Sequence, residues 1–439
     1  MRKFLISAVI IVLALLVAGG SWIYLNQKKQ ATRVEQHMVN KLKDKSAQNA
    51  SETKSKNGKL VVIEPELDGK KVKYSPAVKV DAQEILTKAG SKKGSTAYLS
   101  FSVQQGPESF VAIKPVVKVY TRQKNQRLRL RQTVNLASQT VNQTNGHLLT
   151  LAELVPDNAA VRALNYQLIK QQADDHGLSI TQLNELLNKN FLSETKTTNF
   201  SYSKEGLEIS GVTLGAAEVA PFIAPQYILE SDRVPTATGK FIALTFDDGP
   251  NPATTPAILK TLAEQQVKAT FFMVGTGASA YPALAKEVLE KGHEIGNHSY
   301  DHPQLNTLSP AQMTDQITRT NDAIYSATGK LPDFIRPPYG AVSTTVGATL
   351  PMPLIQWDID TDDWATNDVA AIIGKVRASA HPGAIILMHD THPQSVAALP
   401  GIISYLKQEG YEFKTVKELL GQKLLPGYQY FGQNDYRPA

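Results

Sequence analysis

The chain has 439 residues and contains no cysteine. Disulfide bonds, a thiolate nucleophile and cysteine zinc ligands are therefore excluded, and any bound metal must be held by His, Asp or Glu. Charged residues make up 20% of the chain and hydrophobic residues 42%, which is typical of folded domains rather than of a disordered chain. No internal repeat is present. The length is too great for one ordinary core and predicts two or three domains.

Long apolar runs are also scarce, with one exception near the N-terminus. Residues 4–25 carry no charged side chain, and this length is about enough to span a bilayer. Trp22 and Tyr24 lie where an interfacial aromatic belt would be. A cleaved signal peptide is the alternative, with small residues at 18–20 near its cleavage site. Because the apolar run resumes after the glycines, we expect residues 1–27 to form an uncleaved transmembrane anchor.

The net charge is +6, which would suit an anionic partner. No nucleic-acid reading motif accompanies the charge, so we expect no nucleic-acid partner. Behind a membrane segment, an anionic wall polymer or the membrane surface fits better. Residues 28–59 are rich in Lys, Gln, Asn and Ser and predict a solvated polar linker.

Residues 60–235 mix strand-like and helical patterns and predict an α+β domain. Within it, Arg127, Arg129 and Arg131 would lie on one face of a strand. Such a face would hold an anionic polymer or simply be solvated. We find no catalytic set of residues in this part.

Residues 236–425 alternate between strand and helix patterns, with strands expected near 241–246, 269–275, 294–297, 354–358 and 384–388. This alternation predicts parallel strands joined by helical crossovers. In the barrel form of such a fold, function lies at the C-terminal ends of the strands. The tail, residues 426–439, stays unassigned.

Two adjacent carboxylates, Asp247 and Asp248, follow the apolar run at 241–244, and two imidazoles, His298 and His302, lie four residues apart. One carboxylate and two imidazoles make a three-ligand set for a catalytic zinc-like ion with one position open for water. The other carboxylate is then free to act as a base. The spacing of the histidines would place both on one face of a helical turn. This set predicts a metal-assisted hydrolase.

Further chemical groups follow other predicted strands. Arg336 precedes a proline-fixed loop and would hold a carboxylate in place. In an acidic run, Trp364 would either floor a sugar pocket or belong to the core. His389 ends an apolar strand and would serve as a general acid or as a structural cap, with His392 as a nearby alternative, while His293 reads as a loop residue.

Five segments, in their order along the chain, resemble the motifs of the polysaccharide deacetylases, also called the NodB-homology family or carbohydrate esterase family 4. The resemblance covers residues 240 to about 420. The segments are Thr245-Phe246-Asp247-Asp248-Gly249-Pro250, His298-Ser299-Tyr300-Asp301-His302, Arg336-Pro337-Pro338-Tyr339, Asp362-Asp363-Trp364 and Leu387-Met388-His389. The resemblance implies a distorted (β/α) barrel with a shallow groove. It implies one divalent metal ion, Zn²⁺ or another such as Co²⁺, held by Asp248, His298 and His302.

The same resemblance implies the roles of the other residues. Asp247 would be the general base, oriented by Arg336, and the backbone N–H of Tyr339 would bind the oxyanion. His389 would be the general acid, tuned by Asp363; the motif, rather than the spacing, selects Asp363 over Asp360. The acetyl pocket would be lined by Trp364 and Leu387.

The layout of anchor, α+β domain and C-terminal deacetylase domain is similar to that of membrane-anchored peptidoglycan N-acetylglucosamine deacetylases of Gram-positive bacteria. This similarity implies an extracellular catalytic domain that removes acetyl groups from N-acetylglucosamine in the wall and lowers its susceptibility to lysozyme. One alternative is a deacetylase of muramic acid residues, poly-N-acetylglucosamine, chitin or acetylxylan. Another is a non-catalytic envelope-binding or sensor protein.

Overall fold

The computed structural model describes residues 25–42, 50–55, 58–89, 95–123, 127–187, 192, 199–228, 239–421 and 424–439. The chain forms two compact units. The first contains Met1–Leu151 and Lys196–Ser210, and the second contains Ala152–Thr195 and Gly211–Ala439. The predicted anchor, residues 1–27, lies outside the described residues except for its last three, Leu25, Asn26 and Gln27. Within the described ranges, no helix is long and apolar enough to cross a membrane.

The first unit is built on a sheet with the strand order β1-β2-β5-β6-β7, in which β8 also pairs with β6. Its strands are β1 (Ala50–Ser55), β2 (Gly58–Ile63), β3 (Glu66–Leu67), β4 (Lys70–Lys71), β5 (Ser95–Gln105), β6 (Phe110–Arg122), β7 (Leu128–Asn135), β8 (Gln139–Asn142), β9 (Phe200–Ser203) and β10 (Gly206–Ile209). Helix α2 (Ala77–Ala89) buries Val78, Ala82 and Leu86 on one side of this sheet. The spacing of these three residues gives the helix one apolar stripe, which packs on the alternating inward residues of the strands.

The predicted linker at residues 28–59 is not a plain spacer. Residues 25–42 form a helix, and Val39 packs with Tyr98 and Tyr120 of the sheet. Glu35 of the same helix forms ion pairs with Lys59, at 2.9 Å, and with Arg122. A few apolar residues at helical spacing are enough to dock a helix on a sheet. The prediction of a linker rested on the polar composition of the whole segment and did not consider these residues.

The second unit contains the sheet path β14-β13-β12-β17-β19-β15, with β16 on β17, β18 on β12 and β20 on β19. Its strands are β11 (Val212–Gly215), β12 (Phe241–Asp247), β13 (Thr270–Met273), β14 (Glu294–Asn297), β15 (Leu354–Ile355), β16 (Ile359–Asp360), β17 (Ala384–His389), β18 (Glu412–Phe413), β19 (Tyr428–Gly432) and β20 (Asp435–Pro438). Strands β12, β13, β14 and β17 are parallel, as predicted. Single β-bridges join Ile335 to Asn297 of β14 and to Leu354 of β15. These bridges connect β14 and β15, the two end strands of the path.

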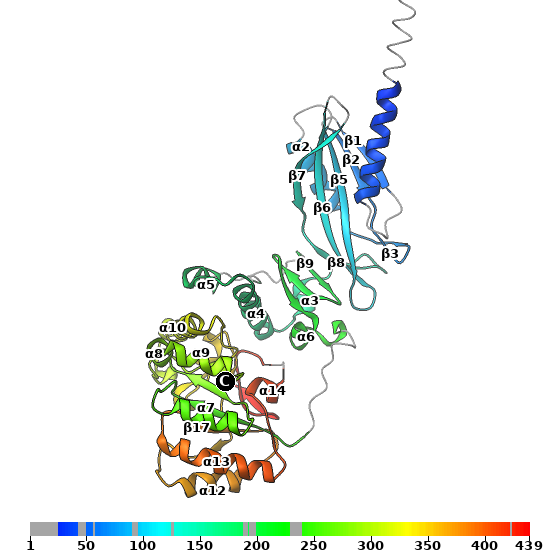
Figure 1. Cartoon of the computed structure of the whole chain (residues 1–439). Coiled ribbons are helices and arrows are strands. Elements are labelled where there is room, and N and C mark those ends of the chain that lie inside the picture. Colours follow the sequence, from blue (N-terminus) through cyan, green and yellow to red (C-terminus); the bar gives the residue numbers. More distant parts are fainter. Residues whose placement is uncertain are drawn as a thin grey trace, which may run out of the picture. The chain divides into compact units, whose positions relative to one another are not determined.

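The helices of this unit are α4 (Asn158–His176), α5 (Ile180–Leu187), α6 (Ala216–Val219), α7 (Thr255–Glu264), α8 (Gly275–Ala280), α9 (Pro282–Glu290), α10 (Pro310–Thr328), α11 (Thr344–Thr349), α12 (Val369–Ser379), α13 (Pro393–Gln408) and α14 (Val416–Leu420); the short α3 (Leu151–Leu154) begins at the boundary of the units. Helices α12 and α13 lie side by side (Figure 1). Apolar residues of β12, β13 and β17 pack against α7, α9, α12 and α13 in one core cluster. The unassigned tail becomes the hairpin β19–β20, whose Tyr430 is buried.

Helix α4 belongs to the second unit, so the chain does not divide at the predicted boundary between residues 235 and 236. Tyr166 of α4 packs with Met313 and Ile317 of α10, and its hydroxyl donates to the carbonyl oxygen of Pro332 at 2.8 Å. Lys170, one turn further along α4, forms an ion pair with Asp333. The helix ends at Gly177, where φ is 56°. Helical patterns in the sequence do not identify the surface on which a helix packs.

Candidate active site and metal site

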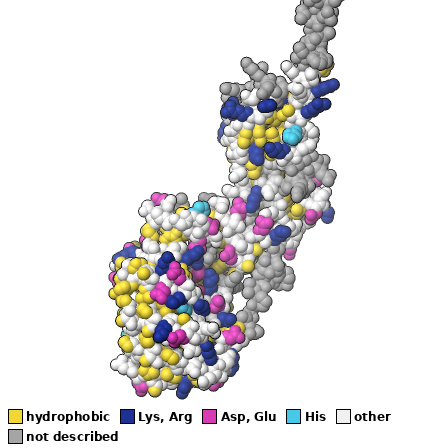
Figure 2. Space-filling model, viewed as in Figure 1, with side chains coloured by type: hydrophobic (Ala, Val, Ile, Leu, Met, Phe, Trp, Pro, Cys, Tyr) yellow, Lys and Arg dark blue, Asp and Glu magenta, His cyan; other side chains and the backbone are white. Residues whose placement is uncertain are grey.

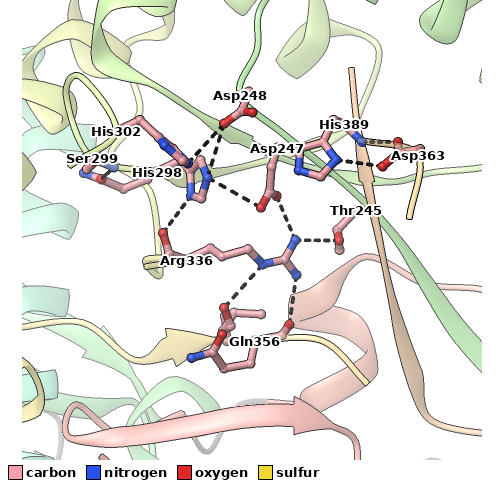
Figure 3. Close-up of polar contacts among 12 residues, drawn as sticks. Thr245, Asp247, Asp248, His298, Ser299, His302, Arg336, Gln356, Asp363 and His389 are labelled. Atoms are coloured by element: carbon pink, nitrogen blue, oxygen red, sulfur yellow. Dashed lines mark hydrogen bonds and ion pairs between the residues drawn. The ribbon is translucent and has the colours of Figure 1, made fainter. Parts of the chain in front are cut away.

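Parallel strands bring the predicted chemical groups to one edge of the sheet. In the register of β12 and β17, Asp247 lies opposite His389, the last residue of β17. His298 follows Asn297, the last residue of β14. Because the carboxyl ends of parallel strands meet at the same edge, these side chains converge (Figure 3).

Asp248, His298 and His302 form a cluster whose ligand atoms all lie within 4.8 Å of one another. Asp248 Oδ1 lies 3.5 Å from His298 Nε2 and 3.4 Å from His302 Nε2. For metal–ligand bonds near 2.0–2.1 Å in a tetrahedral site, neighbouring ligand atoms are separated by roughly 3.3 Å. Asp248 Oδ1 is buried and has no well-formed hydrogen bond among the described residues. The spacing and this buried oxygen fit a divalent ion.

Burial and neighbouring charges act on the pKa of each residue in this cluster. Burial works to raise the pKa of Asp248, but His298 and His302 outweigh it and hold the pKa below its usual range. Burial and the neighbouring His298 lower the pKa of His302. Burial opposes protonation of His298, yet Asp247 and Asp248 raise its pKa. A carboxylate and neutral imidazoles are the forms that bind metal, and an arriving ion displaces any remaining proton.

The two histidines lie in a loop rather than on one face of a helical turn, so that prediction was wrong. Ser299 and His302 have left-handed φ values of 64° and 62°. The side chain of Asn297 stabilises this loop, because its Oδ1 accepts from the N–H of Ser299 at 2.9 Å. The imidazole of His298 is oriented by a 2.7 Å contact between its Nδ1 and the carbonyl oxygen of Arg336, which turns Nε2 toward Asp248.

Asp247 is paired with a completely buried arginine. Arg336 Nη1 donates to Asp247 Oδ1 at 2.8 Å and to Thr245 Oγ1 at 2.7 Å. Its other donors reach the carbonyl oxygens of Gln356, at 2.9 Å, and Ile355, at 3.3 Å. Burial lowers the pKa of Arg336, and Asp247 opposes this effect. The arginine therefore fixes the orientation of the Asp247 carboxylate and compensates its charge in a buried site.

His389 is paired with Asp363. The Nδ1 atom of His389 lies 2.8 Å from Asp363 Oδ1, and the backbone N–H of His389 donates to Asp363 Oδ2 at 2.7 Å. Burial works to lower the pKa of His389, but the hydrogen bond to Asp363 and the charge of Asp247 raise it to about 9. Asp360, by contrast, accepts from the N–H of Asp362 at 2.9 Å. The structure thus places Asp363, rather than Asp360, against the histidine.

Two aromatic side chains stand exposed around these groups. The ring of Tyr339 is 4.6 Å from the ring of His302, and its backbone has a φ of 60°. Trp364 is 59% exposed, which excludes its interpretation as a core residue. Leu387 is buried in β17, two residues before His389.

Some participating residues were missed by the sequence reasoning. Thr245 lies two residues before Asp247 and so shares its strand face, which was a readable signal. Asn321 of α10 accepts from Asn297 Nδ2 at 2.8 Å, and no sequence signal connects the two. His392 is near the site, with its ring 5.5 Å from that of His389, while His293 accepts from the N–H of Ala269 at 3.2 Å as a structural residue.

Asp390 is a further buried carboxyl group beside the site. Its Oδ2 accepts from Thr255 Oγ1 at 2.6 Å. Burial, together with the charges of Asp248 and Asp247, raises the pKa of Asp390 to about 7. A Cβ atom on Gly249 would lie 2.1 to 2.4 Å from the carboxyl atoms of Asp390, so the turn after Asp248 requires glycine at this position.

A buried carboxylate paired with Arg336, an imidazole held by Asp363 and a cluster of residues with metal-ligand spacing meet at the strand ends. The sequence model of the family described as Polysaccharide deacetylase matches residues 235–351. The peptidoglycan-N-acetylglucosamine deacetylase PgdA of Listeria monocytogenes is 34% identical over 356 residues, covering 77% of this chain and 76% of the relative. This chain therefore belongs to the polysaccharide deacetylase family.

Other relatives cover the C-terminal part. The peptidoglycan-N-acetylmuramic acid deacetylase PdaC of Bacillus subtilis is 41% identical over 180 residues, covering 41% of this chain and 38% of the relative. The solved structure of PdaC is 40% identical and covers 41% of this chain and 89% of the solved chain, with a TM-score of 0.40. A chitooligosaccharide deacetylase of Bradyrhizobium is 37% identical over 196 residues, covering 40% of this chain and 90% of the relative.

Proposed function

We propose that this enzyme hydrolyses the N-acetyl group of N-acetylglucosamine in cell-wall peptidoglycan and releases acetate and a free glucosamine amine. The observation that carries the proposal is the set of Asp247, His389 and the three-ligand cluster at one sheet edge. The similarity to PgdA, which extends over both units of the chain, favours N-acetylglucosamine as the substrate. The connection of the sheet path through Ile335 supports a distorted barrel as the scaffold.

The cluster Asp248, His298 and His302 would hold one divalent ion, Zn²⁺ or another such as Co²⁺. When bound, such an ion supplies Lewis-acid activation of water and of the acetyl carbonyl group. Nitrogen and carboxylate ligands suit Zn²⁺ in particular, and three protein ligands leave a position open.

The residues of the chain then share the proton transfers. Asp247, oriented by Arg336, takes a proton from the attacking water. The backbone N–H of Tyr339 donates to the oxyanion that develops on the carbonyl oxygen. His389 is protonated at neutral pH, and its Nε2 donates a proton to the departing amine, while Asp363 holds Nδ1. Trp364 and Leu387 line the acetyl pocket.

The anchor at residues 1–27 would place the catalytic domain outside the cell. Each removed acetyl group leaves a cationic amine at neutral pH, and the modified wall becomes a poorer lysozyme substrate. On the first unit, Arg129 and Arg131 are exposed on β7 and would contact anionic wall polymers. On the viewed face of the second unit, Lys and Arg side chains are interspersed with Asp and Glu (Figure 2), which favours no large anionic ligand there.

A second candidate is deacetylation of muramic acid residues or of chitin-like polymers, favoured by the similarity of the C-terminal part to PdaC and to the chitooligosaccharide deacetylase. A non-catalytic role in envelope binding or sensing is disfavoured, because a binding protein has no need of a buried base, an acid and a ligand cluster together.

The test is acetate release by the purified full chain from N-acetylglucosamine oligomers and from peptidoglycan, with and without a chelator. We expect chelator-sensitive release from both, with glucosamine as the new amino sugar in digested peptidoglycan. If free amines form on muramic acid residues alone, the assignment moves to the second candidate. No release by folded, metal-loaded protein would refute a deacetylase role on these glycans.

A further inference from the structure

A cavity lies between helices α4, α5 and α10 of the second unit. Its volume is about 290 Å³, at the lower end of the range of small-molecule sites. Its apolar walls include Tyr166 and Ile169 of α4, Ile317 of α10 and Leu350. These residues are buried in two neighbouring core clusters, so the walls are well packed.

The cavity contains one cationic side chain and no carboxylate among its lining residues. Arg162 donates from Nη1 to the carbonyl oxygen of Ala348 at 2.8 Å. Its Nε is buried and finds no acceptor among the described residues. A buried guanidinium donor without an acceptor is costly and favours a carboxylate ligand, which guanidinium groups bind with charge-assisted hydrogen bonds.

A second lining residue provides an acceptor. Asn184 of α5 donates from Nδ2 to Asp322 Oδ2 at 3.1 Å, and this bond fixes which side of the amide carries oxygen. Its Oδ1 is buried and has no donor within the part of the chain that the structure describes. A matching ligand therefore carries an N–H or O–H group in addition to its carboxylate.

We propose that this cavity is a binding site for an N-acylated amino acid or short apolar peptide with a free carboxylate. The carboxylate pairs with Arg162, an amide N–H donates to Asn184, and the apolar side chains contact the walls formed by Tyr166, Ile169 and Ile317. A dipeptide of small residues is of the size that the cavity holds.

The cavity is connected to the metal-ligand loop. Asn321 and Ile317 both line it, and both accept hydrogen bonds from Asn297 Nδ2, at 2.8 Å and 3.0 Å. Asn297 in turn holds the N–H of Ser299, next to the ligand His298. We infer that a ligand that shifts α10 here would alter the support of this loop; occupancy of the cavity would then change metal affinity, and metal would change ligand affinity by the same factor.

The experiment measures binding of N-acetyl-alanyl-alanine, in its L,L and D,D forms, to the full chain by calorimetry. The control ligand is the same dipeptide with an amidated C-terminus. We expect saturable binding of the acid that persists with the active site saturated by an N-acetylglucosamine oligomer, and at least about tenfold weaker binding of the amide. Equal binding of acid and amide, loss of binding when the oligomer is present, or no saturable binding of any form, would overturn the proposal.

Two variants test the location. Arg162→Gln removes the cation and should weaken binding of the acid by about tenfold or more, whereas Arg377→Gln on α12 should leave it unchanged. Val161→Phe should fill the cavity and abolish binding, with an unchanged melting temperature as evidence of folding. Unchanged binding in both cavity variants would place the ligand elsewhere. These readouts do not need deacetylase activity, so they stand apart from the proposed function.

A third variant tests the connection. Asn321→Leu removes the acceptor that Asn297 uses, while Asn321→Asp keeps an acceptor oxygen. We expect the dipeptide to change zinc affinity in the wild type and in Asn321→Asp but not in Asn321→Leu. An equal effect of the dipeptide in all three proteins would refute the coupling through Asn321.

Discussion

Replacing Asp363 by Asn should convert His389, the proposed general acid, from an imidazolium with a raised pKa into an ordinary histidine. The pKa of His389 rises from 6.5 to about 9, against the effect of burial, because of the hydrogen bond to Asp363 and the charges of Asp247, Asp363 and Asp248. This rise corresponds to roughly 3 kcal/mol in favour of the protonated form. Because Asp363 supplies the direct hydrogen bond, its loss should remove a large part of this preference.

The direction of the pH effect follows from the raised pKa. A proton donor with a pKa of about 9 is charged below that pH, and activity falls as the pH rises through it. In Asp363→Asn, the descending limb of kcat/KM should move about one to two pH units lower. The new amide also presents N–H groups where Asp363 accepts from His389, which disfavours the Nδ1–H form. At neutral pH, we expect a loss of about a hundredfold or more in kcat/KM, with partial recovery toward pH 6.

The assay is acetate release from an N-acetylglucosamine oligomer between pH 6 and 10. Asp360→Asn is the matched control, since Asp360 lies in the same acidic segment and bonds to Asp362 rather than to His389. Metal content, measured on the same samples, should be unchanged in both variants. A descending limb that stays near pH 9 in Asp363→Asn, or that moves equally in Asp360→Asn, would refute the reasoning.

Three further changes separate the parts of the site. Asp247→Asn should lower kcat by about a hundredfold or more at unchanged metal content, and wild-type activity would contradict its role as the base. His298→Ala should instead lose zinc in a metal assay, and full zinc occupancy would disprove its place in the ligand set. Gly249→Ala should lower kcat/KM at least about tenfold, because its Cβ would meet the carboxyl atoms of Asp390 at 2.1 to 2.4 Å and displace the turn after Asp248. Gly374→Ala on α12, where a Cβ meets no atom within 4 Å, is its control.

The positions of Asp247 and His389 could be predicted from the sequence because each ends an apolar run that becomes a strand. Asp247 and His389 end parallel neighbours β12 and β17, so strand pattern alone brings them to one edge. The charge of Arg336 predicted that it would hold a carboxylate, the family resemblance implied that this carboxylate is Asp247, and the structure shows the pair at 2.8 Å. Here local pattern and chemistry agree, and each supports the other.

The geometry within the loops could not be predicted in the same way. The spacing of His298 and His302 fits a helical turn, but left-handed φ values at Ser299 and His302 produce a loop. That loop depends on Asn297, which in turn bonds to Asn321 on α10. Such a chain of hydrogen bonds is a tertiary property, and no local propensity encodes it.

The largest error concerns α4, and its cause is informative about the molecule. The helix lies between segments of the first unit in the sequence, so its position along the chain indicated the wrong partner. The side chains of α4 show that its partner is the deacetylase part, because Tyr166, Ile169 and Lys170 each contact it. There, Lys170 and Lys417 both form ion pairs with Asp333.

When a buried carboxylate such as Asp333 loses one of its two ammonium partners, the folded protein is strongly destabilised. A fragment that begins at Lys240 would therefore expose the apolar surface under α4 and leave Asp333 with Lys417 alone. The fold of the deacetylase part is thus completed by helix α4, which lies far before its first strand, β12, in the sequence. The same packing of α4 and α5 on α10 creates the cavity that borders Asn321, so the support of the metal-ligand loop and the docking of α4 are parts of one structure.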